Sequence, residues 1–153
     1  RQQGAGRIIN IGSVLGFLPM PFMAMYAATK HAIEGYSESL DHELRTQGIR
    51  VMIVEPAFTK TSFEANALEP DCKRPEYDAI RQHLATHMKQ QMEMGDSPDV
   101  VAETVLKAAT QVRPQLRYTA GRKASTLRLI RKFAPASAMD SGIRKDMKLN
   151  TVL

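Results

Sequence analysis

Tyr26 and Lys30 are the residues of this sequence whose types and spacing could do proton chemistry. They are four residues apart, so on a helix they lie on one face, one turn from each other. An isolated tyrosine hydroxyl stays protonated at neutral pH, but an ammonium one turn away favours the phenolate form. Ser13, at the end of an apolar stretch, adds a hydroxyl that can hydrogen-bond a substrate oxygen. Together the three groups predict an arrangement that moves a proton on or off a carbonyl oxygen.

A strand–helix–strand unit is expected to position these side chains. The apolar stretch at residues 7–11 predicts a short strand, and a helix is expected from Tyr26 to about Gln47, with Gly48 as its C-terminal cap. Residues 49–55 then predict a buried strand of a parallel sheet that is covered on both faces. Strand, helix and strand in this order form a right-handed βαβ unit.

The helix that carries Lys30 is expected to bury one apolar face. The residues predicted on that face are Ala28, Ala32, Ile33, Tyr36, Leu40 and Leu44. Four acidic residues of the same helix are expected on its other faces: Glu34, Glu38, Asp41 and Glu43.

An ordered series of residues around Tyr26 and Lys30 resembles the short-chain dehydrogenase/reductase family. The series contains Asn10 and Ser13, the motif Tyr26-Ala-Ala-Thr-Lys30, residues 32–35, 38–40, 43–45 and 48–51, and Pro56 with Thr61. A bare Tyr-x-x-x-Lys pair is a weak signal, whereas the whole series over about 55 residues is specific. The resemblance implies an α/β fold: the C-terminal portion of a doubly wound, Rossmann-type parallel sheet with flanking helices.

The resemblance also implies an activity, the interconversion of an alcohol and a carbonyl by hydride transfer with NAD or NADP. Tyr26 would pass the proton to or from the substrate oxygen, and Ser13 would orient that oxygen. Lys30 would favour the phenolate of Tyr26 and hold the nicotinamide ribose. The cofactor supplies the difficult chemistry, and the protein supplies placement and charge.

The loop after the second strand is implied to meet the nicotinamide end of the cofactor. The resemblance assigns this role to Pro56, Phe58 and Thr61, together with Tyr26 and Lys30. Ala57 stands where the family usually has glycine. Capping of a following helix is the alternative role for Thr61.

The glycine-rich turn that binds the dinucleotide in this family is not found in the sequence. Gly4, Gly6, Gly12 and Gly16 lack the G-x-G-x-x-G order. The chain therefore resembles the C-terminal catalytic portion of a longer enzyme. The alternative function is a non-catalytic fragment that acts by binding or assembly. On either view, we expect the isolated chain not to bind NAD(P)H tightly.

Composition predicts a single domain over residues 1–153, since 43% of the residues are hydrophobic and 24% are charged. Within it, residues 1–61 would form the catalytic core and residues 62–95 a substrate lid. Residues 96–121 would supply a last helix and strand, and residues 122–153 a basic tail.

The lid is expected to contain a helix over residues 76–94, and a second helix is expected to start at Ser97-Pro98. The predicted buried stripe of the second helix is Val101, Val105, Leu106, Ala109 and Val112. Methionines and an aromatic residue in the lid and before Tyr26 favour a lipophilic substrate, although such residues are more often core. They are Met20, Phe22, Met23, Met25, Met88, Met92 and Met94.

No metal site is predicted. His83 and His87 are four residues apart, but the Glu of an H-E-x-x-H motif and a third ligand are missing. Cys72 is the single cysteine, which cannot form an internal disulfide and favours a reducing, cytoplasmic setting. No apolar run is long enough for a membrane span.

The basic tail is the remaining feature of the sequence. Residues 113–148 hold ten Lys and Arg against two Asp, in a chain with a net charge of +5. Nucleic-acid binding is disfavoured because no recognition motif accompanies the charge. A solvated tail helix with its apolar side on the domain is favoured over weak peripheral contact with a membrane. The resemblance implies a small-molecule substrate and a homo-oligomer for the full-length protein.

Overall fold

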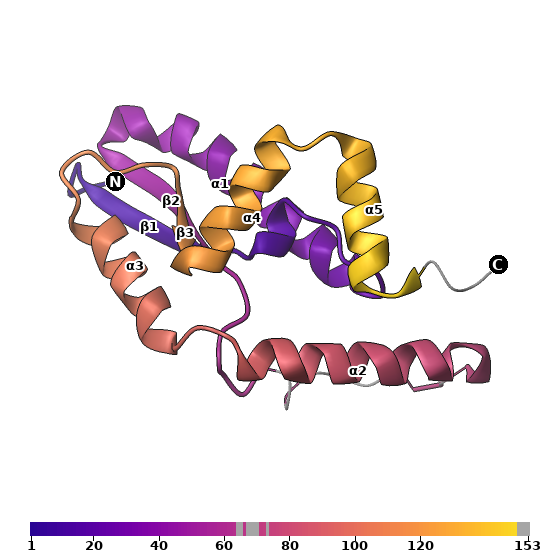
Figure 1. Cartoon of the computed structure of the whole chain (residues 1–153). Coiled ribbons are helices and arrows are strands. Elements are labelled where there is room, and N and C mark those ends of the chain that lie inside the picture. Colours follow the sequence, from indigo (N-terminus) through magenta and orange to yellow (C-terminus); the bar gives the residue numbers. More distant parts are fainter. Residues whose placement is uncertain (64–65, 67–70, 73, 150–153) are drawn as a thin grey trace.

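The computed structural model describes residues 1–63, 66, 71–72 and 74–149, and its centre is a three-stranded parallel sheet (Figure 1). The strands are β1 (Gly6–Ile11), β2 (Ile49–Pro56) and β3 (Arg117–Ala120), which lie side by side in that order. Residues 51–54 of the central strand are fully buried. The predicted α/β fold with a parallel sheet is therefore confirmed.

Helices cover both faces of this sheet. The helices α1 (Ala24–Leu44) and α4 (Gly121–Phe133) lie on one face, and α3 (Pro98–Thr110) packs on the other. The other helices are α2 (Asp78–Glu93), α5 (Ala136–Asp146) and the short η1 (Val14–Gly16), η2 (Arg45–Gln47) and η4 (Pro75–Tyr77). In Figure 1, α2 runs below the body that holds the sheet.

The predicted helix ends match the structure. Gly48 follows η2 with a φ of +73°, and a Cβ atom there would lie only 2.1 Å from the carbonyl oxygen of Gly4. Only glycine fits this position, as expected of a C-terminal cap. The Ser97 hydroxyl accepts a hydrogen bond from the Asp99 N–H at 3.1 Å, so Ser97 caps α3.

The buried stripe of α3 is narrower than predicted. Val101 and Val105 pack on the sheet as expected, and Ala108 is fully buried beside them. The prediction was wrong for Ala109, Leu106 and Val112, which are exposed. The three inward residues follow the spacing i, i+4 and i+7, and Val112 lies beyond the end of the helix.

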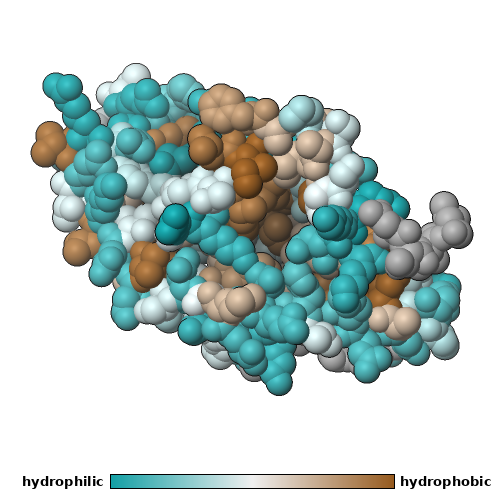
Figure 2. Space-filling view, in the orientation of Figure 1, coloured by the Kyte–Doolittle hydropathy of each residue, from teal (hydrophilic) through white to brown (hydrophobic). Residues whose placement is uncertain are grey.

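The basic tail forms two helices, α4 and α5, and buries only part of its apolar residues. Ala124 and Leu127 pack against the core. Leu129, Ile130 and Phe133 are 60%, 44% and 70% exposed, so the expected packing of these side chains on the domain is wrong. Their positions lie on a different side of the helix from Ala124. In Figure 2, apolar surface gathers where Figure 1 places α4.

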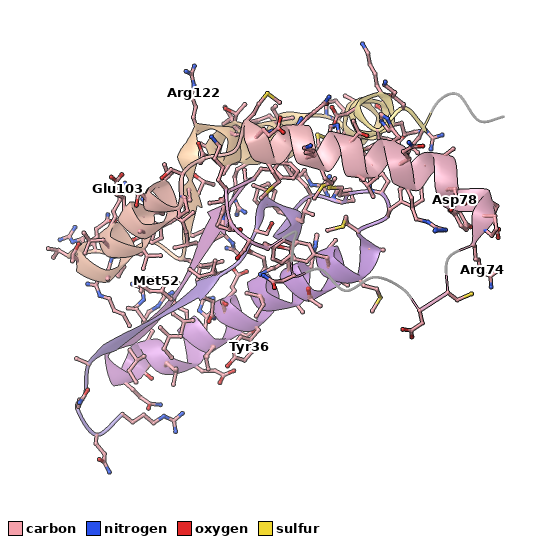
Figure 3. All side chains as sticks on the ribbon, turned by 90° about the horizontal axis from the view of Figure 1, so that it is seen from below. Tyr36, Met52, Arg74, Asp78, Glu103 and Arg122 are labelled. Carbon is pink, nitrogen blue, oxygen red and sulfur yellow. The ribbon has the colours of Figure 1, made fainter. Side chains whose placement is uncertain are left out.

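The face of α1 that packs on the sheet is the largest departure from the sequence prediction. Its buried residues are Glu34, Ser37, Asp41 and Leu44. The predicted apolar residues Ala28, Ala32 and Tyr36 are exposed instead. Figure 3 labels Tyr36, which is 58% exposed on α1, and Met52, which is fully buried in the sheet.

Partners on the strands explain why acidic side chains occupy this interface. Asp41 accepts hydrogen bonds from Arg50 Nε at 2.8 Å and from the Val51 N–H at 2.9 Å. Glu34 accepts one from Arg117 Nε at 2.9 Å. A charged group is tolerated in the interior when it is paired and hydrogen-bonded, which helical periodicity does not reveal.

Candidate active site

Ser13 lies just beyond the end of β1, in the turn that leads into η1. The Gly12 N–H donates to the Val54 carbonyl at 2.8 Å, which holds the turn against β2. A Cβ atom at Gly12 would lie 2.9 Å from Ile53 Cγ2, so a larger residue would displace the turn. The Ser13 Oγ accepts a hydrogen bond from the Leu15 N–H at 3.1 Å. Its position is thus fixed by the strand before it and the helical turn after it.

Lys30 joins the end of β1 to the first turns of α1. Its Nζ donates to the Ile11 carbonyl at 3.1 Å and lies 5.6 Å from the centroid of the Tyr26 ring. Burial lowers the pKa of the Lys30 ammonium from its ordinary value. The one-turn spacing predicted from the sequence therefore places Tyr26 and Lys30 together, at the strand end from which Ser13 follows.

The loop after β2 reaches the same region through Thr61. The Thr61 Oγ1 accepts a hydrogen bond from the Phe63 N–H at 3.3 Å. The Phe63 ring meets the Tyr26 ring edge-on, with 5.7 Å between centroids and 61° between planes. Because β1 and β2 are parallel, their carboxyl ends meet at one edge of the sheet, where open α/β sheets bind ligands.

Two other residues implied in cofactor contact lie elsewhere on this loop. Pro56 is the last residue of β2 and is paired with Ala120 of β3. The Phe58 carbonyl accepts from the Asp96 N–H at 2.9 Å, and its ring lies 5.1 Å from Lys123 Nζ. Phe58 thus packs toward the start of α4. Thr61 instead bonds to Phe63, whose ring contacts Tyr26.

A shallow open hollow of about 680 Å³ adjoins Thr61 and the end of α2. It is lined by Lys60, Thr61, Ser62, Met92 and Glu93. None of the residues of α2 is buried. Two polar contacts join it to the tail helices: Lys123 donates to Gln91, and His87 Nε2 lies 3.4 Å from an Asp146 oxygen. Residues 64–65, 67–70 and 73 of the predicted lid lie outside the described residues, and its described part borders Thr61 through Met92 and Glu93.

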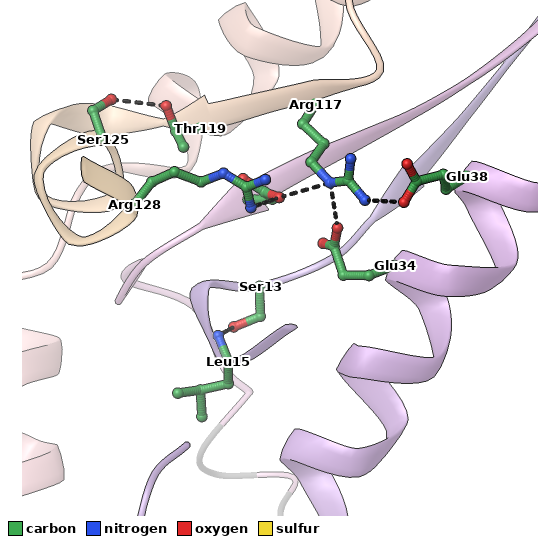
Figure 4. A network of polar contacts seen from close by, with 9 residues as sticks. Ser13, Leu15, Glu34, Glu38, Arg117, Thr119, Ser125 and Arg128 are labelled. Carbon is green, nitrogen blue, oxygen red and sulfur yellow. Dashed lines mark hydrogen bonds and ion pairs between the residues drawn. The ribbon is translucent and has the colours of Figure 1, made fainter. Parts of the chain in front are cut away.

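A buried charge network beside the Ser13 turn was missed by the sequence reasoning (Figure 4). Arg128 Nη1 donates to Glu55 Oε1 at 2.6 Å, and Arg117 lies between Glu34 and Glu38 at 2.9 and 2.8 Å. One oxygen of Glu34 and one of Glu55 have no hydrogen-bond partner among the described residues. Burial, followed by the charge of the facing Glu34, raises the pKa of Glu55 to about 7.

The charge network contacts the turn after Ser13 at Gly16. A Cβ atom at Gly16 would lie 2.9 Å from Glu34 Cγ, so Glu34 packs directly under the turn that starts with Ser13. One signal in the sequence pointed to it, because Glu55 directly follows the apolar residues 51–54 of the strand. Its partner Arg128 is 73 residues away, and no local pattern connects the two.

Among the described residues, no three His, Cys, Asp or Glu side chains come together as metal ligands. The rings of His83 and His87 are 6.5 Å apart, and His87 pairs with Asp146. None of the helices in that part of the chain combines the length and apolar character needed to cross a bilayer.

Comparisons with known proteins give one consistent answer. The family model described as short chain dehydrogenase matches residues 1–71. An uncharacterized oxidoreductase of Schizosaccharomyces pombe is 38% identical over 122 residues, which cover 79% of this chain and 51% of the relative. The chain thus spans about half the length of the curated relatives it matches.

Solved structures show the same fold. A short-chain dehydrogenase from Streptomyces avermitilis matches with a TM-score of 0.70 and 25% identity, over 97% of this chain and 52% of that one. A short-chain dehydrogenase/reductase from Burkholderia phymatum in complex with NAD matches with a TM-score of 0.64 and 27% identity. That match covers 86% of this chain and 49% of the Burkholderia chain.

Proposed function

Because this chain belongs to the short-chain dehydrogenase/reductase family, we propose that it supplies the catalytic residues of an NAD(P)-dependent oxidoreductase that interconverts an alcohol and a carbonyl. The observation that carries the proposal is the position of Lys30. Its ammonium joins the end of β1 to α1 beside the Tyr26 ring. The chain spans about half the length of its relatives, so the activity is proposed for the protein as a whole.

The proton step belongs to Tyr26. In carbonyl reduction its hydroxyl donates a proton to the substrate oxygen, and in alcohol oxidation the phenolate accepts one. The Lys30 Nζ lies 5.6 Å from the ring centroid, so a positive charge stands beside the group that transfers the proton. The Ser13 Oγ accepts from the Leu15 N–H, so its own O–H is left to donate to the substrate oxygen. Ser13 thereby orients the carbonyl for proton transfer.

The residues present fit the nicotinamide end of NAD or NADP. A lysine ammonium has three N–H donors, and the Ile11 carbonyl accepts one from Lys30, which leaves donors for ribose hydroxyls. Pro56, the last residue of β2, lies at the same edge of the sheet, and the loop that follows it carries Thr61. The nicotinamide supplies or accepts the hydride when bound. The similar Burkholderia protein is in complex with NAD, which supports this class of cofactor.

The side chains near Tyr26 favour a lipophilic substrate. Phe22, Met25 and Phe63 are 46%, 80% and 55% exposed, and the Phe63 ring touches the Tyr26 ring. Exposed thioether and aromatic groups beside a proton donor suit an apolar ligand of irregular shape.

Tyr26→Phe tests the proposed chemistry. The variant keeps the ring and its contact with Phe63 but removes the hydroxyl, so carbonyl reduction should fall by about 10²-fold or more. Binding of NADH or NADPH, measured by titration calorimetry, should stay within a factor of a few. Tyr36→Phe, at an exposed position on the same helix, is the matched control and should leave the rate unchanged. Normal turnover by Tyr26→Phe would contradict the role of Tyr26.

A second function, non-catalytic binding or assembly, is favoured by two apolar surfaces. In the described part of the chain, β1 is paired only with β2, and Ile8 and Ile11 are 40% and 48% exposed on it. Tyr36 is also exposed on α1, which suits association into a homo-oligomer. The same calorimetry, done on the full-length protein, separates the two functions. Failure of both nucleotides to bind, together with self-association in ultracentrifugation, would favour assembly over catalysis.

A further inference from the structure

The helix α4 has one face that is fixed to the core. Ala124 is fully buried in a cluster with Val14 and Leu18. From the same side of the helix, Arg128 donates to the buried Glu55 at 2.6 Å and lies 4.8 Å from the Phe17 ring. These contacts hold the helix in one rotational orientation, so its opposite face is held outward.

The outward face carries large apolar side chains. Leu129, Ile130 and Phe133 are 60%, 44% and 70% exposed. Residues 129, 130 and 133 follow helical spacing and therefore form one stripe.

Basic residues flank the stripe. Arg122 and Lys132 are exposed, and Lys132 Nζ lies 5.4 Å from the Phe133 ring. In Figure 3, Arg122 extends away from the body of the molecule. The sequence of α4, GRKASTLRLIRKF, contains no acidic residue. Residues 113–148 carry a net charge of +8 in a chain whose net charge is +5, so positive charge is concentrated in the segment that contains α4.

We propose that the outward face of α4 docks on an anionic lipid bilayer. Leu129, Ile130 and Phe133 would enter the boundary between headgroups and acyl chains, and Arg122 and Lys132 would meet lipid phosphates. An apolar stripe between basic flanks is the pattern by which amphipathic helices lie in a membrane interface. Each basic residue adds attraction to an anionic surface.

Charge complementarity favours a lipid bilayer over a second copy of the chain or a nucleic acid as the partner of this face. A second copy of the chain would place the same positive face against itself, and like charges oppose such a contact. Single-stranded nucleic acid would satisfy the charge, but it binds through aromatic stacking surfaces and gains nothing from exposed aliphatic side chains such as Leu129 and Ile130. A lipid surface uses both the charge and the apolar stripe.

Vesicle sedimentation of the purified protein tests the proposal. We expect the protein to sediment with phosphatidylcholine vesicles that contain phosphatidylserine, and much less with phosphatidylcholine alone. Arg122→Glu with Lys132→Glu should weaken binding by at least about 25-fold, from about fivefold per basic residue. Raising NaCl from about 0.1 to 1 M should also release the protein, because the Debye length falls from about 10 to 3 Å.

A second pair of variants tests the apolar stripe. Leu129→Ser with Phe133→Ser should reduce vesicle binding by at least about tenfold, since two apolar side chains no longer insert. Val112→Ser and Lys107→Glu are the controls, because both residues are exposed but lie on or beyond α3. Neither control should change binding. Far-UV circular dichroism would establish that each variant keeps its helices.

Three results would overturn the proposal. The first is no sedimentation with either vesicle. The second is full binding by the variant that lacks Leu129 and Phe133, which would reduce the interaction to charge alone. The third is an oligonucleotide that displaces the protein from vesicles and binds the serine variant equally well. None of these results depends on catalytic activity, so they leave the proposed function untouched.

Discussion

A fully buried carboxylate lies at each end of β2, and the two carboxylates have different hydrogen-bond partners. Asp41 reaches from α1 to the amino end of the strand at Val51. Glu55 belongs to the strand itself and lies near its carboxyl end. Both residues have no exposed surface. Neither carboxylate reaches the surface, and the two differ in their partners.

Asp41 has a donor for each of its oxygens. Oδ1 accepts from Arg50 Nε at 2.8 Å and from the Val51 N–H at 2.9 Å, and Oδ2 accepts from Arg45 and from Arg50 Nη2. Burial by itself would raise the pKa of Asp41, but the hydrogen bonds from Arg50, Arg45 and Val51 hold that pKa well below its usual range.

Glu55 has fewer donors and a like charge beside it. Arg128 donates to Oε1, Arg117 Nε is 3.8 Å from the same oxygen, and Oε2 has no partner among the described residues. Burial and the facing Glu34 raise the pKa of Glu55 to about 7, against the charge of Arg128. The carboxylate with more donors therefore has the lower pKa of the two. Glu55, the carboxylate with fewer donors, is the one beside Ser13. Carboxylates with shifted pKa values are common near functional sites.

Removal of the Asp41 charge is the largest expected perturbation. Asp41→Asn should lower the free energy of unfolding at pH 7 by about 3–5 kcal/mol, because it removes the charged partner of Arg50, whose side chain is only 25% exposed. The folded-state pKa of Asp41 lies below the ordinary 3.8, so its stabilisation is complete above that pH and is lost as the pH falls below it. Urea unfolding at pH 7 and at pH 3 measures both effects.

The matched control for this change is Glu43→Gln, on the exposed side of α1 two residues further along. It should alter the free energy of unfolding by less than about 0.5 kcal/mol. A loss of similar size in both variants would mean that the pairing of Asp41 adds nothing beyond a general charge effect.

The elements of the fold could be predicted because their signals are local. The apolar stretch of β1, the glycine at position 48 and the Ser97-Pro98 start of α3 each act through neighbours in the chain. The spacing of Tyr26 and Lys30 is local in the same sense. For that reason the sequence also predicted their placement on one side of a helix.

Contacts between distant segments could not be predicted in this way. Glu34 is buried because Arg117 pairs with it from 83 residues away, and Glu55 because Arg128 does so from 73 residues away. A hydrophobic pattern counts a glutamate as a surface residue, so it assigned the inward face of α1 to Tyr36 instead. Tertiary partners decided which side of that helix is buried.

Neutralising Glu55 should have a smaller effect than the change at Asp41, and of opposite sign. In Glu55→Gln the amide oxygen can still accept from Arg128, and the amide N–H can donate to the unpartnered oxygen of Glu34. We expect a gain of about 1–2 kcal/mol in the free energy of unfolding at pH 8. Urea unfolding at a series of pH values is the measurement.

The pH dependence gives the sharper test of the same variant. The folded state holds the Glu55 proton more tightly than the unfolded chain, so stability falls as the pH rises from the ordinary 4.5 to about 7. That decline should be absent in Glu55→Gln. Glu38→Gln is the control and should keep it, because Arg117 lowers the pKa of Glu38. A decline that persists in Glu55→Gln would belong to another group, such as a histidine.

The smallest expected effect comes from Arg45, the most exposed donor to Asp41. Its side chain is 51% exposed and pairs with Asp41 across one helical turn, whereas the Arg50 side chain is 25% exposed. Exposed pairs of this kind contribute about 0.3–0.5 kcal/mol, so Arg45→Gln should cost no more than that in urea unfolding. The cost should shrink further in about 1 M NaCl, where exposed charges are screened. A loss as large as that of Asp41→Asn would show that Arg45, rather than Arg50 and the Val51 N–H, keeps this carboxylate ionised.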